Sequence, residues 1–346
     1  MLTFYNEHHA QHDGRFAFVQ GAQVACWERP ERAALVAGEL QRRGLGNIVI
    51  PHGVSLASLE RIHTPRYLHF LRTAWQDWIA SDPANAARDA FASSWPVRAM
   101  RCDIEPDDIH ARFGLYSMDT TTPLTAGTWI AAKTGADCAI NAAHALRLGE
   151  HGTFALTRPP GHQAGADHFG GACFLNNAAL AAQHLLDDGV QRVAILDIGA
   201  QHGSGTQSIF YARRDVLVTS LHADPRGSAP FYAGHGDETG AGDGLGFNLN
   251  VPLARDATPA QWFAALETAC LKITMSGAEA LVVSLGVDTF SGDAAAFSLA
   301  SADFLRLGER IAHLGLPAVF VFEGGSVVAE LGINVVNVLE GFETAN

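Results

Sequence analysis

Residues 192–206 read RVAILDIGAQHGSGT and carry the clearest structural pattern in the chain. A short apolar run ends at Asp197 and opens into a loop rich in glycine. In α/β proteins, chemistry is concentrated where a parallel strand ends in such a loop. The pattern therefore predicts a buried strand over 192–197, followed directly by a functional loop.

Apolar runs and amphipathic segments alternate along most of the remaining chain. The apolar runs are nearly continuous, as expected for parallel strands that are covered on both faces. We therefore expect one α/β domain over 1–346, with a central, mostly parallel sheet flanked by helices on both faces. The expected strands are Asn47–Ile50, Thr153–Leu156, Arg192–Asp197, Val216–Leu221, Ala280–Gly286 and Pro317–Glu323. The expected helices are Pro30–Arg43, Ala126–Leu148, Asn177–Asp188, Pro259–Ser276 and Ala302–Leu314.

One segment, at about residues 88–122, does not follow this alternation. It contains two prolines among mixed charges, in the runs WPVR at 95–98 and DIEPDD at 103–108. Long loops in compact domains are usually functional or disordered. We expect a long, ordered insertion loop here.

Composition limits the possible partners and the cellular compartment. The chain has 346 residues, 48% of them hydrophobic, which is enough for a large core. A formal net charge of −13 argues against a nucleic-acid partner and is compatible with a cationic small molecule. The five cysteines are dispersed, which favours reduced thiols over disulfides or a thiolate zinc site. With no signal-peptide pattern and no apolar run of membrane-spanning length, we expect a cytoplasmic protein without a membrane partner.

Four further blocks occur in a fixed order around the first one. They read RPPGHQAG at 158–165, GGACFLNN at 170–177, GVDTFSGD at 286–293 and EGGS at 323–326. Together the blocks resemble those of the histone deacetylase superfamily, and the resemblance runs essentially from end to end. Other segments, such as YSMD at 116–119, resemble its acetylpolyamine amidohydrolase branch. The resemblance implies an arginase/deacetylase-like fold.

His162 is a candidate proton-transfer residue. The segment alone is equally compatible with an active-site loop and with an exposed histidine on a Pro-Gly turn. In the family, two adjacent histidines flank a metal-bound water, and the second is the main base. Here that second position is Gln163. A glutamine amide cannot accept a proton near pH 7.

The resemblance also implies a zinc site, for which the ligand positions are Gly199, Gln201 and Asp288. Of these three, the resemblance leaves only Asp288 as a zinc ligand of the family type. A catalytic zinc normally needs three protein ligands, so we expect no catalytic zinc in the usual place. Ser326 occupies the position of an oxyanion-stabilising tyrosine and is too short to reach the same point.

A structural potassium ion is a further implication of the resemblance. Its site would comprise Asp197, Ser220 and Leu221, together with positions 199 and 201. Much of such a site is backbone carbonyl, which does not depend on side-chain identity, so we expect Gly199 and Gln201 to serve. The alternative is that Asp197 only caps the loop.

Substrate contacts follow from the same resemblance. Phe174 is expected to form a wall of the substrate tunnel, with Gln201 nearby. Asp103 and Glu105 are expected to meet a cationic amine at the tunnel mouth, although a solvated acidic loop explains them equally well. In the family branch, the insertion helps to form a dimer, which predicts a homodimer.

Three functions remain open. We expect a deacetylase-family protein that has lost the zinc site and zinc-dependent amide hydrolysis, and that binds an acyl-amine or related small molecule. The first alternative is zinc-independent acid–base chemistry by a His162–Asp197 dyad, with Gln163, Gln201 and Ser326 as hydrogen-bond donors. The second alternative is an active zinc amidohydrolase whose metal shell is rearranged, for instance with Asp288 and either His202 or His168 as ligands.

Overall fold

The computed structural model describes residues 1–294 and 297–345 and is built around an eight-stranded sheet. The strand order is β4-β1-β5-β10-β9-β6-β7-β8, and every neighbouring pair is parallel. A separate antiparallel hairpin joins β2 to β3. The strands are β1 Leu2–Tyr5, β2 Phe16–Val19, β3 Ala22–Ala25, β4 Asn47–Val49, β5 Gly152–Leu156, β6 Val193–Asp197, β7 Val216–Ala223, β8 Asn248–Leu253, β9 Ala280–Leu285 and β10 Ala318–Phe322.

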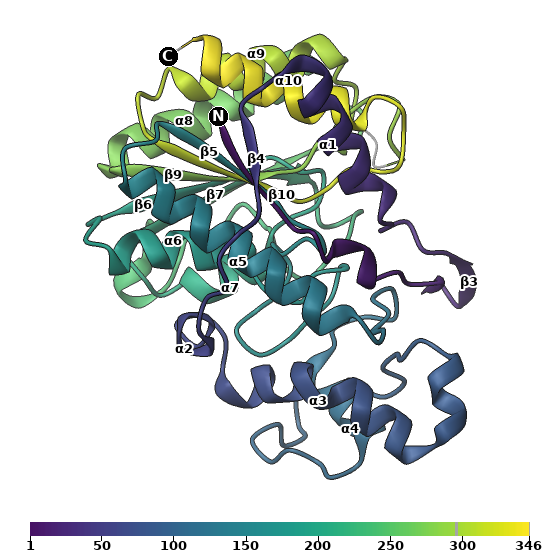
Figure 1. The fold of residues 1–346 in the computed structure, drawn as a ribbon. Coiled ribbons are helices and arrows are strands. Elements are labelled where there is room, and N and C mark those ends of the chain that lie inside the picture. Colours follow the sequence, from purple (N-terminus) through teal and green to yellow (C-terminus); the bar gives the residue numbers. More distant parts are fainter. Residues whose placement is uncertain (295–296, 346) are drawn as a thin grey trace.

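Helices cover both faces of the sheet, as Figure 1 shows. One layer holds α1, α8, α9 and α10, and the other holds α5, α6 and α7; α3 and α4 lie farther out below the second layer (Figure 1). The helices are α1 Glu31–Arg43, α2 Leu56–Leu59, α3 Pro65–Ser81, α4 Ile109–Tyr116, α5 Thr128–Arg147, α6 Asn177–Asp187, α7 Ser204–Phe210, α8 Pro259–Ser276, α9 Ser301–Ala312 and α10 Leu331–Thr344, with short 3-10 turns η1 His9–Gln11, η2 Pro83–Ala87 and η3 Gly242–Gly244.

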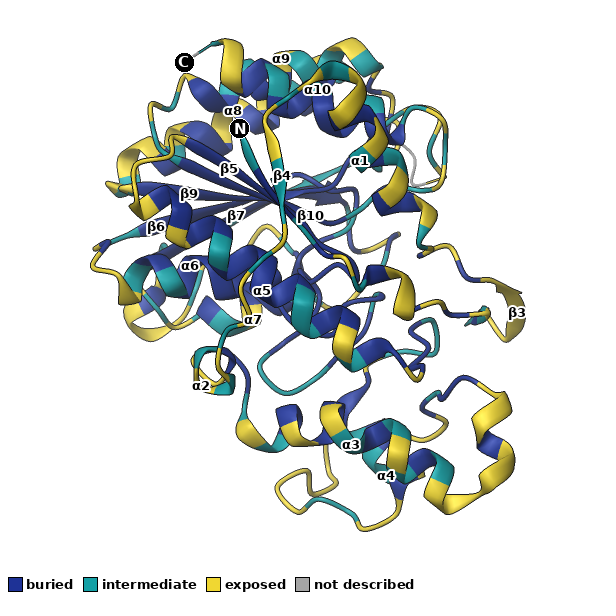
Figure 2. Cartoon of the chain, viewed as in Figure 1, coloured by how far each residue is buried: buried dark blue, intermediate teal, exposed yellow. Residues whose placement is uncertain are grey.

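Burial follows the layers. All residues of β5, β6, β7, β9 and β10 are buried, and Figure 2 shows these strands as a continuous dark-blue centre. Each face of the sheet has its own apolar cluster, one packed under α5 and α6 and the other under α1, α8, α9 and α10. Continuous apolar strands are stable only when helices cover both faces, which explains the pattern in the sequence.

The predicted architecture is confirmed, and its omissions have local causes. The terminal strand β1 and the two-turn α7 were not predicted, because each is too short for a clear periodic pattern. The long helix α3 was also missed, although Thr64 caps it and a proline follows in its first turn. The insertion at 88–122 was expected to be a loop; it is mostly loop, but it contains α4, which Asp108 caps.

The register of the sheet gathers polar side chains at one edge. Asp197 at the end of β6 pairs with Ser220 on β7 and with Ser284 on β9. The loops that follow β5, β6, β9 and β10 leave from this same edge, so residues far apart in the chain meet there. Among the residues that the structure describes, no helix has the length and apolar character needed to cross a membrane.

Candidate active site

A pocket of about 310 Å³ opens at the carboxyl edge of the sheet. It is bounded by the loops after β5, β6, β9 and β10 and by the chain segment that precedes α1. Most of its lining side chains are polar or acidic. The residues that line it are Trp27, Pro160, His162, Gln163, Gly171, Gln201, Asp288, Asp293, Ala294, Glu323, Gly324, Gly325 and Ser326.

His162 and Asp197 form a buried pair beneath the pocket. Nδ1 of His162 lies 2.9 Å from Oδ2 of Asp197, and both residues are almost fully buried. Burial lowers the pKa of His162, but the charge of Asp197 and its hydrogen bond outweigh this effect and raise it to about 9. At neutral pH the imidazole is therefore protonated, so His162 is a proton donor in this pocket. The predicted dyad is present in the structure.

Two carboxyl groups face this imidazole from other loops. Burial raises the pKa of Asp288 to about 6 and that of Glu323 to about 7. Oε2 of Glu323 accepts hydrogen bonds from the backbone of Gly161 and His162, at 2.6 and 3.2 Å. Its Oε1 is buried and has no hydrogen-bond partner. Glu323 is thus a proton acceptor that the sequence analysis missed. The signal available in the sequence was its position directly after an apolar run.

The two glutamines of the pocket contact each other. Nε2 of Gln163 donates to Oε1 of Gln201 across 2.7 Å. At the rim, the backbone N–H and the hydroxyl of Ser326 both donate to the carboxylate of Asp293, at 2.7 and 2.9 Å. Asp293 is a second lining residue that the sequence analysis did not single out as functional.

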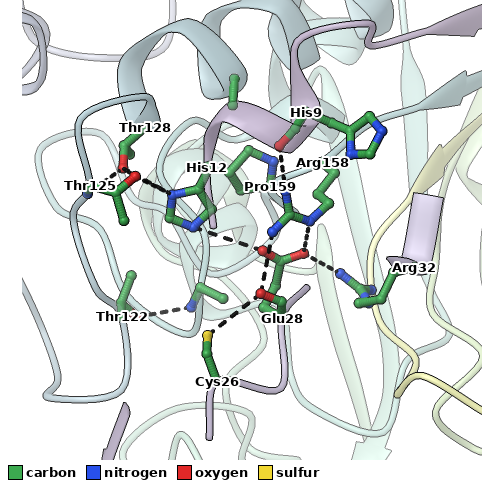
Figure 3. Close-up of polar contacts among 12 residues, drawn as sticks. His9, His12, Cys26, Glu28, Arg32, Thr122, Thr125, Thr128, Arg158 and Pro159 are labelled. Carbon is green, nitrogen blue, oxygen red and sulfur yellow. Dashed lines mark hydrogen bonds and ion pairs between the residues drawn. The ribbon is translucent and has the colours of Figure 1, made fainter. Parts of the chain in front are cut away.

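A buried ionic cluster lies around Glu28, as Figure 3 shows, and it supports the wall of the pocket. The carboxylate of Glu28 lies 2.8 Å from both Arg32 and Arg158 and 3.8 Å from His12. Burial raises the pKa of Glu28, but the two guanidinium groups outweigh this effect, so the net pKa is lowered. Arg32 also donates to the carbonyl oxygens of Glu323 and Gly325. The cluster therefore fixes the backbone that carries the pocket's acidic wall.

Three predicted substrate residues do not line the pocket. Phe174 is fully buried and packs against Phe169 and His12, with ring centroids 5.3 and 5.2 Å apart. Asp103 is exposed and paired with Arg101, as its alternative interpretation as a solvated acidic residue implied. Glu105 accepts the hydroxyl hydrogen bond of Tyr116. Neither Asp103 nor Glu105 is among the residues that line the described pocket.

This fold is an α/β fold of the arginase/deacetylase kind, and the chain belongs to the histone deacetylase family. Residues 26–342 match the family's histone deacetylase domain. The chain is 47% identical over 344 residues to acetylpolyamine amidohydrolase 2 of Pseudomonas aeruginosa, with 99% of both chains covered. It is 42% identical to an acetylpolyamine amidohydrolase of Mycoplana ramosa, again over 99% of both chains. The crystal structure of acetylpolyamine aminohydrolase from Burkholderia pseudomallei superposes with a TM-score of 0.94 at 36% identity, over 100% of this chain and 99% of that one.

This relationship contradicts the main functional expectation. A protein that has lost the zinc site and amide hydrolysis and only binds its ligand was expected, because two ligand positions hold Gly199 and Gln201. Relatives matched along their whole length at 42–47% identity are amidohydrolases, and they give no indication of a lost zinc site. The expectation took two side-chain identities as decisive for the whole function, and the end-to-end relationship overturns it.

The family typically uses zinc, and the candidate zinc ligands of this chain are Asp288, His202 and His168. Asp288 Oδ1 already accepts the backbone hydrogen bond of Ala200, at 2.8 Å. An added Cβ at Gly199 would lie 3.5 Å from that same oxygen, so position 199 does face Asp288. His202 binds Gln207 and, like His168, does not line the pocket. As placed, these residues do not form a set of three ligands, and we assign no step to a metal ion.

Proposed function

We propose that the chain is an amidohydrolase that removes an acyl group from a cationic amine of the acetylpolyamine type. The observation that carries the proposal is the match, over almost the whole of both chains, to acetylpolyamine amidohydrolases. The pocket is consistent with this substrate class, because Asp288, Asp293 and Glu323 give its wall an acidic character that attracts a cation. A zinc ion in this pocket would need ligands arranged differently from those that the family resemblance implies.

The residues of the chain supply the proton transfers of such a reaction. The imidazolium of His162, oriented by Asp197, donates a proton to the leaving nitrogen. Glu323, with a pKa of about 7 and a free buried oxygen, accepts a proton from the attacking water. Cleavage of the amide then releases the carboxylic acid and the amine and leaves Glu323 protonated and His162 neutral. Transfer of the proton from Glu323 to His162, whose pKa is the higher of the two, restores the starting state. The second N–H of the Gln163 amide, which is not used in the hydrogen bond to Gln201, is the candidate oxyanion donor of the lining, whereas the hydroxyl of Ser326 already donates to Asp293.

A second candidate is the same acid–base pair working without zinc. It is favoured by the order of the two pKa values: His162 stays protonated to about pH 9, whereas Glu323 ionises at about 7. Groups whose protonation states are separated in this way can act as acid and base at the same pH. Resistance of the activity to a chelator would identify this candidate.

The test is release of free amine from N-acetylputrescine, acetylspermidine and an acetyl-lysine peptide. Protein stripped with a chelator is assayed with and without added zinc. We expect amine release that falls roughly 10²–10⁴-fold in His162→Ala. His168→Ala is the matched control, because that histidine lies outside the pocket lining. Failure of all three substrates in both metal states would refute the proposal.

We also propose a structural potassium ion near Asp197. Oδ1 of Asp197 accepts from the backbone of Gly199 at 3.3 Å, and Ser220 lies beside it in the sheet register. The carbonyl groups of Gly199, Gln201 and Leu221 remain the candidate backbone ligands. Replacing sodium by potassium at constant ionic strength should raise the thermal midpoint, because an ion that binds only the folded chain stabilises it. Equal midpoints in the two salts would contradict this site.

A further inference from the structure

We propose a second metal site, for a divalent transition metal, where α5 and α6 end. It comprises His144 on α5, His184 on α6 and Asp188, the residue that caps α6. One ligand atom from each of these three residues lies within 4.8 Å of the other two. Among the residues that the structure describes, this is the one group of three or more histidine, cysteine or acidic side chains with such spacing.

The distances between the carboxylate and the two imidazoles fit the spacing of zinc ligands. Oδ2 of Asp188 lies 3.6 Å from Nδ1 of His144 and 3.3 Å from Nε2 of His184. In a tetrahedral site with ligands about 2.0–2.1 Å from zinc, neighbouring ligand atoms are roughly 3.3 Å apart. The Asp188 oxygen therefore already lies close to one tetrahedral edge length from each imidazole nitrogen. Only the approach of the two imidazoles to each other has to adjust.

The helices explain why the three side chains meet. His184 and Asp188 are four residues apart, so they lie on one face of the α6 terminus. His144 reaches them from α5. Its ring packs against that of His184, with the ring centroids 5.7 Å apart. Helix α5 packs directly against α6, which places the third ligand on a second rigid element. Sites built from helix side chains are well positioned for binding.

The neighbouring contacts leave this carboxylate available. Asp187 is occupied by Arg61, at 2.8 Å, and by Gln183. Arg147 donates to the backbone carbonyl of Asp188. The Nε2 atom of His184 is buried and makes no hydrogen bond. A metal ion between the three groups would take this nitrogen as a ligand in place of its 3.3 Å contact with the Asp188 carboxylate.

The ligand types select the metal. Two imidazoles and one carboxylate suit zinc, copper, nickel or cobalt, whereas magnesium and calcium prefer oxygen ligands. His144 and Asp188 are exposed, so water completes the shell. None of the three residues lines the candidate active site, and the inference does not depend on the proposed function. Bound metal would join the ends of α5 and α6 and stabilise the folded chain.

The experiment uses the full chain, stripped with a chelator and titrated with Zn²⁺ against a chromophoric competitor, and with Co²⁺ followed by its visible absorption. We expect one saturable equivalent at this site. Each of His144→Ala, His184→Ala and Asp188→Asn should weaken it by more than about 10–100-fold, since loss of a supporting second-layer residue alone costs that much. The thermal midpoint of wild type should rise with zinc, and that rise should disappear in the three variants.

Matched controls separate this site from other histidines and carboxylates. Asp187→Asn changes the adjacent carboxylate, and His313→Ala removes another exposed histidine; both should bind like wild type. Asp288→Asn reports on the candidate active site in the same titration. Absence of saturable binding, or an equivalent that persists in all three site variants, would overturn the proposal.

Discussion

At the level of single residues, the protonation of His162 is the property that controls the pocket. Its raised pKa, about 9, comes from the carboxylate of Asp197 rather than from exposure to solvent. Glu323 and Asp288 titrate lower, at about 7 and 6. Activity that needs a protonated His162 and an ionised carboxylate should therefore fall above about pH 9 and below about pH 6–7. A pH–rate profile with a single limb would contradict this assignment.

Replacing Asp197 by asparagine tests the same pair through stability. A histidine whose folded pKa exceeds its unfolded value stabilises the fold fully below that unfolded value, about 6.5, and the stabilisation is lost as the pH rises through about 9. The variant should therefore be less stable than wild type by roughly 3 kcal/mol near pH 6. The difference should shrink by pH 10. Urea denaturation at the two pH values measures it, and a difference independent of pH would show that the pair is not coupled.

At the level of elements, the turn into α7 passes close to the buried pair of His162 and Asp197. A Cβ added to Gly203, which precedes that helix, would lie 2.2 Å from Oδ2 of Asp197. Gly203→Ala should displace this carboxylate, because the added methyl group would overlap its oxygen. The next atoms, Cγ of Asp197 and Cβ of His162, both lie at 3.4 Å. We expect a loss of activity of at least about tenfold, together with a lowered pKa of His162, followed by NMR titration of the ring.

Gly227→Ala is the control for that substitution. A Cβ at Gly227 meets nothing within 4 Å, and its φ is not in the left-handed region. The control should retain wild-type activity and stability. Equal effects of the two substitutions would show that the backbone, and not the carboxylate, responds to the added methyl group.

At the level of the whole molecule, the buried cluster around Glu28 connects the segment before α1 to two pocket loops. Glu28→Gln would leave two buried guanidinium groups without their counter-charge, and Arg158 and Arg32 are both fully buried. Removing one partner of a buried ion pair costs about 3–5 kcal/mol. Chemical denaturation should show a loss of this size. Glu31→Gln, which removes an exposed pair with Arg29 and a carboxylate in the first turn of α1, should cost far less stability than Glu28→Gln.

The predicted homodimer also belongs to this level. The insertion at 88–122 exposes five large apolar side chains, of which Val97, Met100 and Ile104 are the most exposed, each about 60% accessible. Contiguous exposed apolar groups often mark an interface. Light scattering should give a dimer for wild type and a monomer for a Val97→Asp, Ile104→Asp variant. A wild-type monomer at micromolar concentration would contradict the prediction.

Much of the fold could be obtained from local patterns. Continuous apolar runs identified five of the central strands, because a parallel strand buried on both faces has no polar alternation. The loop after residue 197 and His162 were identified from motif order, and the structure brings both to one pocket. The functional expectation was wrong where it let Gly199 and Gln201 outweigh the relationship of the whole chain.

Only the tertiary structure could show which distant side chains meet. Glu28 contacts Arg158 from 130 positions away, and the serine at 326 is bound by a carboxylate 33 positions earlier. The partnership of His144 with His184 depends on how α5 packs against α6. The pKa values of His162 and Glu323 likewise follow from burial and from charges on other loops. Local sequence governs backbone conformation and apolar periodicity, whereas desolvation and ion pairing depend on neighbours that only chain folding brings together.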